Sequence, residues 1–131
     1  MVMEYNFLNG NIPQEISNLS ALEILDLRFN EFTGSIPFGI FNMSSLIAID
    51  ISGNSLSGRL PEDICDDIPN LEVLTLAKNE LYGQIPSNLY KCRYLQKLAL
   101  SYNHFNGSIP SEIGSLIKLR ILDLGRNDLT G

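Results

Sequence analysis

Three aspartates recur at matching places in the sequence and are the first candidates for chemistry. Each lies between two aliphatic residues, as Asp26 does between Leu25 and Leu27, and the other two are Asp50 and Asp123. Paired carboxylates can serve as general acid and general base. Such catalysis also needs a pocket that excludes water, so its feasibility depends on the element that carries these residues.

Metal chemistry has weaker support in the sequence. Four acidic residues flank one of the two cysteines: Glu62, Asp63, Asp66 and Asp67. This stretch lacks the alternating ligands and the glycine turn of a calcium-binding EF-hand loop. His104 is the single histidine, and one histidine cannot complete a zinc site or a catalytic triad. We therefore expect no metal and no cofactor, and we interpret the acidic stretch as a solvated face.

The composition narrows the class of protein. Of the 131 residues, 44% are hydrophobic and 18% are charged, which suffices for a continuous core. The net charge of −6 argues against a nucleic-acid partner, which would require a basic surface. No stretch approaches about 18 consecutive apolar residues, and no signal peptide precedes the chain's repeated motif. We expect any export or membrane-anchoring segment to lie outside this chain.

A repeat of about 24 residues organises the whole chain. Asparagines recur at steps of 24, 24, 25, 24 and 24 residues, at Asn6, Asn30, Asn54, Asn79, Asn103 and Asn127. The frame around them is L-x-x-L-x-L-x-x-N-x-[LF]-x-G-x-[IL]-P, and its first complete copy runs from Leu22 to Pro37. We divide the chain into one array with repeats at approximately 1–21 (partial), 22–45, 46–70, 71–94, 95–118 and 119–131 (partial).

The first half of the frame predicts a short strand followed by an inward turn. The alternation Leu25-Asp26-Leu27 has the period of a strand that buries its leucines and exposes the residue between them. Six such strands, paired in parallel about 4.8 Å apart, would build a concave face roughly 24 Å long. Backbone groups buried unpaired at the turn would cost about 1–3 kcal/mol each, and asparagine amides can bond them. We therefore predict a structural ladder of the six asparagines. An open face offers no water-excluding pocket, so we interpret the three aspartates as structural or solvated.

The second half of the frame predicts a bend and a helical turn. Glycines such as Gly34 permit a tight bend before a second short strand. Prolines such as Pro37 fix φ at the end of that strand or in the first turn of a short helix. Ile113 and Leu116 lie three residues apart, which suits one 3₁₀ or α turn with its apolar side inward.

The two cysteines occupy different slots of the repeat. Cys92 shares a slot that predicts an inward side chain, with Leu19, Met43 and Leu116. Cys65 shares a slot that predicts an outward one, with Ser17, Phe41, Tyr90 and Gly114. Because the two slots point differently, we favour packing of Cys92 as a small hydrophobe over a bridge to Cys65. Cysteine usage alone fixes neither the redox state nor the compartment.

The complete frame resembles the plant-specific leucine-rich repeat, and the resemblance covers all 131 residues. It implies an α/β solenoid: a right-handed superhelix with a concave parallel β-sheet, short lateral second strands, and 3₁₀ or short helical turns on the convex side. This class looks like the ectodomains of plant receptor-like kinases, receptor-like proteins and polygalacturonase inhibitors. Residues 40–46 and 68–74 are similar to the receptor-kinase group that holds immune receptors for bacterial flagellin and elongation factor.

The resemblance implies a non-catalytic, protein- or peptide-binding segment of a plant cell-surface receptor ectodomain, in immune or developmental signalling. Its expected location is the extracellular side of the plasma membrane or the apoplast. The implied partners are a peptide or protein ligand and a co-receptor ectodomain, with no nucleic acid and no membrane contact by this segment. The sequence has no kinase signature, so a kinase would belong to a parent protein. The alternatives are a soluble inhibitor of a wall-degrading enzyme, of the polygalacturonase-inhibitor type, and a receptor-like protein without a kinase.

Recognition in such an array falls to the variable positions between the frame residues. Val2, Glu4 and Tyr5 would extend the concave face at its front. Our predicted ligand-binding residues on this face include two aromatic residues of the type enriched at hot spots: Asp26, Arg28, Phe29, Asp50, Lys78, Lys97, Tyr102 and Arg126. The alternative is that this segment only spaces the contact repeats of a longer array.

Three N-x-Ser sequons begin at Asn18, Asn42 and Asn106. The frame puts the first two on the outer side of the coil and the third in the lateral bend, away from the concave rows. We predict N-glycosylation of these residues in a secreted parent, with the concave sheet left free.

We also predict marginal stability or weak solubility for the isolated chain. Solenoids normally carry polar caps at both ends, and this sequence begins in a strand and has no paired-cysteine cap. A thermal scan followed by circular dichroism checks this expectation. A cooperative transition of the monomer at high temperature would contradict it.

Overall fold

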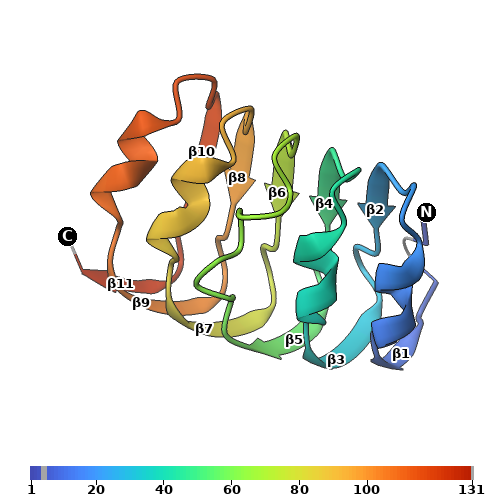
Figure 1. The fold of residues 1–131 in the computed structure, drawn as a ribbon. Helices are drawn as coiled ribbons and strands as arrows, with labels where there is room; N and C mark the ends of the chain where they lie inside the picture. The colour runs from blue at the N-terminus through green and yellow to red at the C-terminus, as the bar shows by residue number, and fades with distance from the viewer. Residues whose placement is uncertain (4–5, 131) are drawn as a thin grey trace.

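The computed structural model describes residues 1–3 and 6–130 and shows a coil of stacked turns (Figure 1). Five parallel strands form one sheet along the coil, which we call the concave sheet. They are β2 (Ile24–Asp26), β4 (Ala48–Asp50), β6 (Val73–Thr75), β8 (Lys97–Ala99) and β10 (Ile121–Asp123). The register is uniform, so that Leu25 pairs with Ile49 and Ile49 with Leu74. Equivalent residues of successive turns therefore form straight rows.

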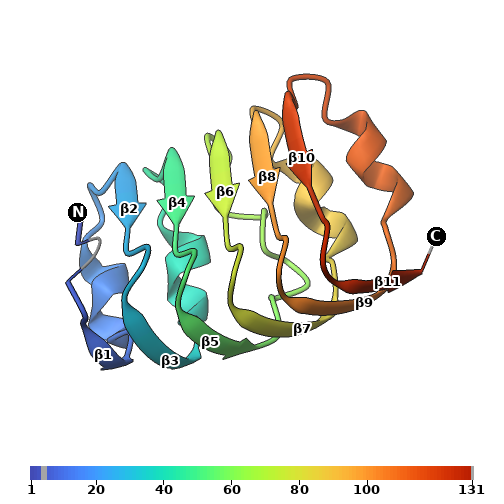
Figure 2. The same cartoon turned by 180° about the vertical axis from the view of Figure 1, so that it is seen from behind.

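A second sheet of six parallel strands runs along the neighbouring side of the coil (Figure 2). This lateral sheet contains β1 (Asn9–Asn11), β3 (Glu31–Ser35), β5 (Ser55–Gly58), β7 (Glu80–Gln84), β9 (His104–Ser108) and β11 (Asp128–Thr130). All but β1 begin directly after an asparagine of the repeat. Gly34 and Gly107, with φ of +78° and +74°, allow the bend within β3 and β9.

Four 3₁₀ helices cover the convex side: η1 (Gln14–Asn18), η2 (Phe38–Asn42), η3 (Ser87–Lys91) and η4 (Ser111–Ser115). Each follows a proline whose φ lies between −59° and −63°, a value preset for helix entry. The corresponding segment 62–70 forms turns instead of a helix (Figure 1). Within the described part of the chain, no helix has the length and hydropathy needed to span a membrane.

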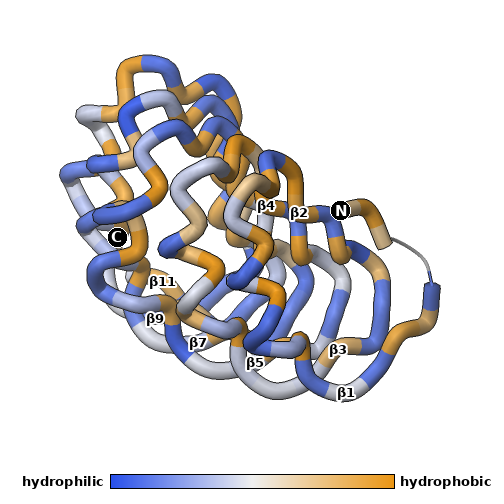
Figure 3. Tube along the Cα trace, turned by 45° about the vertical axis from the view of Figure 1, so that its right-hand side comes forward, coloured by the Kyte–Doolittle hydropathy of each residue, from blue (hydrophilic) through white to orange (hydrophobic). Residues whose placement is uncertain are grey.

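The core is one continuous column of aliphatic side chains inside the coil. Apolar positions recur at matching places in successive turns (Figure 3). The strand leucines Leu25, Leu74 and Leu98 are fully buried, because each lies between the turns before and after it. Leu122 in the edge strand β10 has no further strand beyond it among the described residues and is 46% exposed.

The recurring asparagines join each turn of the coil to the preceding one. The Nδ2 of Asn79 donates to the carbonyls of Leu76 and Ala77 in its own turn and to that of Ile51 in the preceding turn. Its Oδ1 accepts the backbone N–H of Leu56 at 3.1 Å. The same set of bonds recurs at Asn30, Asn54, Asn103 and Asn127. Asn6 is exposed and donates its backbone N–H to the Oδ1 of Asn30.

Among the described residues the concave sheet has five strands, where the sequence predicted six. Residues 1–3, at the start of the chain, contribute a single β-bridge there, between Val2 and Asp26. The backbone of this segment is still held in place, because the N–H of Met3 donates to the carbonyl of Asp26 at 2.8 Å. Glu4 and Tyr5, which we expected to extend the concave face, lie outside the described residues.

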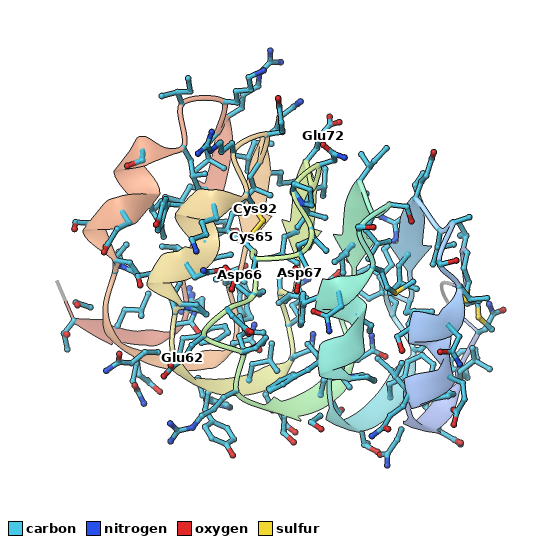
Figure 4. The ribbon with its side chains drawn as sticks, in the orientation of Figure 1. Glu62, Cys65, Asp66, Asp67, Glu72 and Cys92 are labelled. Carbon is cyan, nitrogen blue, oxygen red and sulfur yellow. A yellow bond between two sulfur atoms is a disulfide. The ribbon has the colours of Figure 1, made fainter. Side chains whose placement is uncertain are left out.

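The expectation that Cys65 and Cys92 stay apart is wrong: they form a disulfide (Figure 4). The slot of Cys65 does not fix a direction, because Phe41 occupies the same slot in the regular helix η2 and is also buried. The turn that contains Cys65 is in addition one residue longer than the others and has no 3₁₀ helix. Cys65 points inward and is only 2% exposed, and its Cα lies 5.4 Å from that of Cys92. The backbone N–H of Cys65 also donates to the Oδ1 of Asn88.

Removing this disulfide is expected to destabilise the fold strongly. The bridge closes a loop with a sequence separation of 27, and the chain-entropy relation gives about 3–4 kcal/mol for a loop of that length. The double variant Cys65→Ala with Cys92→Ala should therefore lose about that much unfolding free energy in urea denaturation. Reduced wild-type protein should lose a similar amount. A loss below about 1 kcal/mol in both samples would contradict a stabilising bridge.

Candidate functional site

The outward rows of the concave sheet and the turn that follows it form the candidate binding surface. Among the residues predicted from the sequence, Asp26, Arg28, Asp50 and Lys97 are partly buried there, and Phe29, Lys78, Tyr102 and Arg126 are exposed. The structure separates seven of them into two groups with different surroundings, and Lys97, at the start of β8, belongs to neither. Arg28 and the two aspartates interact with one another, whereas the residues that directly precede the asparagines form a line along the edge of the face.

The residue directly before each asparagine of the repeat from Asn30 onward, in what we call the left-handed slot, has a left-handed backbone conformation. Phe29, Lys78, Tyr102 and Arg126 have φ between +55° and +58°, and Gly53 in the same slot has φ +69°. This conformation costs about 1–2 kcal/mol for a residue with a side chain. The coil enforces it, because the N–H groups of the slot donate to carbonyls of the next turn, as that of Lys78 does to Ser101 at 2.9 Å. Only one of the five copies has the glycine that would relieve the strain.

Aromatic and cationic side chains alternate along this slot, and we call Phe29, Lys78, Tyr102 and Arg126 the aromatic–cation ridge. The Nζ of Lys78 lies 5.9 Å from the ring centroid of Phe29 and 5.9 Å from that of Tyr102. The guanidinium carbon of Arg126 lies 6.0 Å from the Tyr102 centroid. Each cation–π contact contributes about 0.5–1 kcal/mol at an exposed site and limits the rotamers of the partners.

Gly53 leaves the space that makes the ridge continuous. The ring of Phe29 lies directly over it, so a Cβ on Gly53 would collide with the ring carbons of Phe29. Phe29 can therefore extend across one turn and reach the ammonium group of Lys78 in the next. The ridge depends on one missing side chain as well as on four present ones.

Beside the ridge lies a patch of small residues, which we call the small-residue floor: Ser52, Thr75, Ala77, Ala99 and Ser101. They belong to the outward rows, yet each is between 5% and 9% exposed. The Oγ1 of Thr75 is buried and has no hydrogen-bond partner among the described residues. An unpaired buried hydroxyl is unfavourable for the free protein, by about 1–3 kcal/mol.

The aspartates at the N-terminal end of the face have structural partners. The Nε of Arg28 lies 3.4 Å from the Oδ2 of Asp26, and its Nη1 lies 3.7 Å from the Oδ2 of Asp50. Asp50 also accepts the backbone N–H of Ser52 at 3.1 Å and its hydroxyl at 2.6 Å, and Asp26 accepts the N–H of Arg28. Asp123 repeats this turn with the N–H of Gly125. These carboxylates hold the chain where it leaves the strand.

Arg28 is thus shared between two neighbouring carboxylates, while Lys78, Lys97 and Arg126 form no salt bridge within the described residues. The available positive charge of the face therefore lies over β6, β8 and β10. From the sequence we predicted all four cations, Arg28 included, as ligand-binding residues without distinction. The two aspartates in the same row, 24 residues apart, were the signal that Arg28 would be neutralised.

The three sequon asparagines are exposed and lie away from this face. Asn18 and Asn42 end the helices η1 and η2, and Asn106 lies in the lateral strand β9. Val2, which we expected at the front of the concave face, is exposed there beside β2.

The geometry defines a class of protein. Parallel strands that stack in register, an asparagine ladder behind them and 3₁₀ turns on the far side together form a leucine-rich-repeat solenoid. The model of the leucine rich repeat family matches residues 20–81 and 69–129, and this chain belongs to that family. A comparison with curated protein sequences gives no match.

Solved structures with the same fold include plant receptor ectodomains. The ectodomain of the Arabidopsis thaliana receptor kinase GASSHO1/SCHENGEN3, solved with CASPARIAN STRIP INTEGRITY FACTOR 2, has a TM-score of 0.94 and 42% identity; the match covers 98% of this chain and 15% of that one. The Arabidopsis receptor kinase HAESA, in complex with the peptide hormone IDA and the co-receptor SERK1, has a TM-score of 0.91 and 36% identity, with 98% and 22% covered. A plant ice-binding protein has a TM-score of 0.89 and 31% identity, with 100% and 42% covered. The chain thus spans less than half of each of these proteins.

The left-handed slot gives a prediction about stability. Tyr102→Gly and Tyr102→Ala both remove the ring, but only glycine relieves the strained φ, so the glycine variant should be the more stable by about 0.5–1 kcal/mol. Tyr82 in strand β7 is a matched control with a similar exposure, 46% against 52%. There the order should reverse, because glycine weakens a strand. Urea denaturation measures both pairs; the same order at the two sites would contradict the strain.

Proposed function

We propose that this chain is a non-catalytic, ligand-binding segment of a plant cell-surface receptor ectodomain, and that an extended peptide or protein segment lies along its concave sheet. The observation that carries the proposal is the exposed aromatic–cation ridge beside the small-residue floor. The similarity to the receptor kinase HAESA, solved with a peptide hormone and a co-receptor, supports it.

The ridge has the properties of a preorganised contact line. Tyrosine and arginine are enriched at binding hot spots, and Tyr102 is 52% exposed. The left-handed backbone and the cation–π contacts restrict the ridge side chains before any ligand arrives, which lowers the entropy lost on binding. Backbone strain of this kind is often retained at functional sites. Glycine would fit the position before each asparagine without strain, yet four of the five copies carry a side chain there. This choice supports a role for the ridge side chains beyond building the coil.

The floor supports an extended ligand instead of a compact one. Small side chains at Ala77, Ala99 and Ser101 allow a ligand main chain to come close to the sheet. A ligand donor or acceptor could also pair with the hydroxyl of Thr75 after a change of its χ1 rotamer. Such pairing would convert an unfavourable group of the free protein into a favourable one of the complex.

We place the contact over β6, β8 and β10, together with Phe29 at the start of the ridge. Lys78, Lys97 and Arg126 would orient acidic groups of the ligand. Arg28, Asp26 and Asp50 would instead maintain the shape of the N-terminal part of the face. From the sequence we predicted all eight residues as ligand contacts. This proposal reassigns three of them, Arg28, Asp26 and Asp50, to a structural role.

We also propose the setting of this segment. The buried disulfide is consistent with an extracellular location, since such bonds persist in oxidising compartments. The segment would form part of one repeat array with the repeat boundaries given above, and a co-receptor ectodomain would be a second partner. A kinase domain would belong to the parent protein, outside these 131 residues.

A display library of random linear peptides, selected on the folded chain, tests the proposal. Peptides enriched on the wild type should bind at least tenfold more weakly to Lys78→Ala and Tyr102→Ala, as expected for hot-spot side chains. The matched controls are Tyr82→Ala and Tyr90→Ala, which remove exposed tyrosines from other faces. Equal binding by the ridge variants, or losses limited to the control variants, would favour the spacer alternative.

A further inference from the structure

A large groove lies on the side of the coil away from the concave sheet. It has a volume of about 1050 Å³ and runs from the outer face of β7 and β9 to the helices η3 and η4. We call it the lateral groove. Polar side chains from three successive turns line it, among them Gln84, Tyr90, Asn106, Ser108 and Glu112. None of the residues assigned to ligand binding on the concave face belongs to its walls.

A glycosylation sequon forms part of the groove wall. Asn106 and Ser108 are its first and third residues, and both are exposed. Asn106 pairs in register with Gln84 of β7 on one side and with Asp128 of β11 on the other. The side chain of Gln84 lies against Gly107, where a Cβ would come within 3.2 Å of the Gln84 Cγ. Because Gly107, the middle residue of the sequon, has no side chain, the amide of Gln84 can lie beside Asn106.

The wall that η3 forms carries an aromatic ring. Tyr90 on η3 is 41% exposed. The helix is fixed by its neighbours: the Nδ2 of Asn88 and the Nζ of Lys91 each donate to Asp66 at 3.0 Å, and Cys92 directly after the helix is in the disulfide (Figure 4). The amide of Asn88 and the ammonium of Lys91 hold the pKa of Asp66 below its ordinary value. Tyr90 is thus presented to the groove from a tethered helix.

We propose that Asn106 is N-glycosylated and that the first sugars of its glycan lie in the lateral groove, stacked on Tyr90. The inference rests on the proposed extracellular setting. Sugars present hydroxyls and amides that suit the polar lining, and an apolar ring face that suits a tyrosine. Asn18 and Asn42 do not line this groove, so glycans there would extend into solvent.

The modification itself is a simple transfer. The Nδ2 of Asn106 forms one bond to the anomeric carbon of a sugar carried on a polyprenyl diphosphate, and the bond from that carbon to the diphosphate oxygen breaks. The amide loses one proton and the lipid diphosphate leaves, so no oxidant or reductant is required. The glycan would cover the groove and leave the concave sheet as the accessible face.

A double-mutant cycle between Asn106→Gln and Tyr90→Ala, in the full chain secreted from a eukaryotic cell line, tests this proposal. Peptide mapping gives the occupancy of the three sequons, and thermal unfolding gives the Tm of each variant. We expect Asn106 to be occupied, and the two substitutions to be non-additive by about 3 °C in Tm. Additive effects with an occupied Asn106 would overturn packing in the groove.

Two controls separate the possible outcomes. The same cycle with Asn42→Gln should be additive, and the Asn106 cycle should become additive in protein made in bacteria, which lacks the glycan. Non-additivity that persists in the bacterial protein would show direct coupling without sugar and would overturn the proposal. A bare Asn106 beside occupied Asn18 and Asn42 would also overturn it, while leaving the extracellular setting and the concave binding face intact.

Discussion

The fold depends on one recurring interaction, in which an asparagine side chain satisfies the backbone where the chain turns into the coil. Asn79 bonds two carbonyls of its own turn together with a carbonyl and an N–H of the preceding one. Without these bonds, several buried backbone groups would be unpaired at every turn, at about 1–3 kcal/mol each. Because the amide joins neighbouring turns, it also fixes their spacing and keeps the strands in register.

The inward turn has a second effect on the surface. The residue just before each asparagine must adopt the left-handed conformation so that the next residue can point into the coil. The structural residues and the proposed contact residues are therefore adjacent: Asn79 and Asn103 hold the turns together, and Lys78 and Tyr102 lie on the surface beside them. The strained slot directs its side chains along one line, which is how residues 49 positions apart in sequence, Phe29 and Lys78, come into contact.

The periodic features could be predicted from the sequence, because a local frame repeated six times specifies strands, turns and the positions of the asparagines. The features that interrupt the period could not. The turn around Cys65 has an extra residue and no helix, and its slot holds an exposed Tyr90 in one regular turn and a buried Phe41 in another, so a comparison of slots gave the wrong answer for the disulfide. The row that holds Asp26 and Asp50 was a signal for the neutralisation of Arg28, but the salt bridges themselves depend on distances between side chains of two strands. The burial of Thr75 and Ala77 depends on their neighbours, whereas their own types indicated only small, variable positions.

The uniform register of the concave sheet has a consequence for any extended chain that crosses it. Neighbouring strands are about 4.8 Å apart, whereas an extended peptide advances about 3.3 Å per residue. Two strand spacings, about 9.6 Å, nearly equal three peptide residues, about 9.9 Å, so the two lattices come into phase once every third residue. Phe29 and Lys78 are separated by two turns, as are Lys78 and Arg126. A matching partner would present its contact side chains at every third residue. This spacing differs from the two-residue alternation of a strand and from the heptad of a helix.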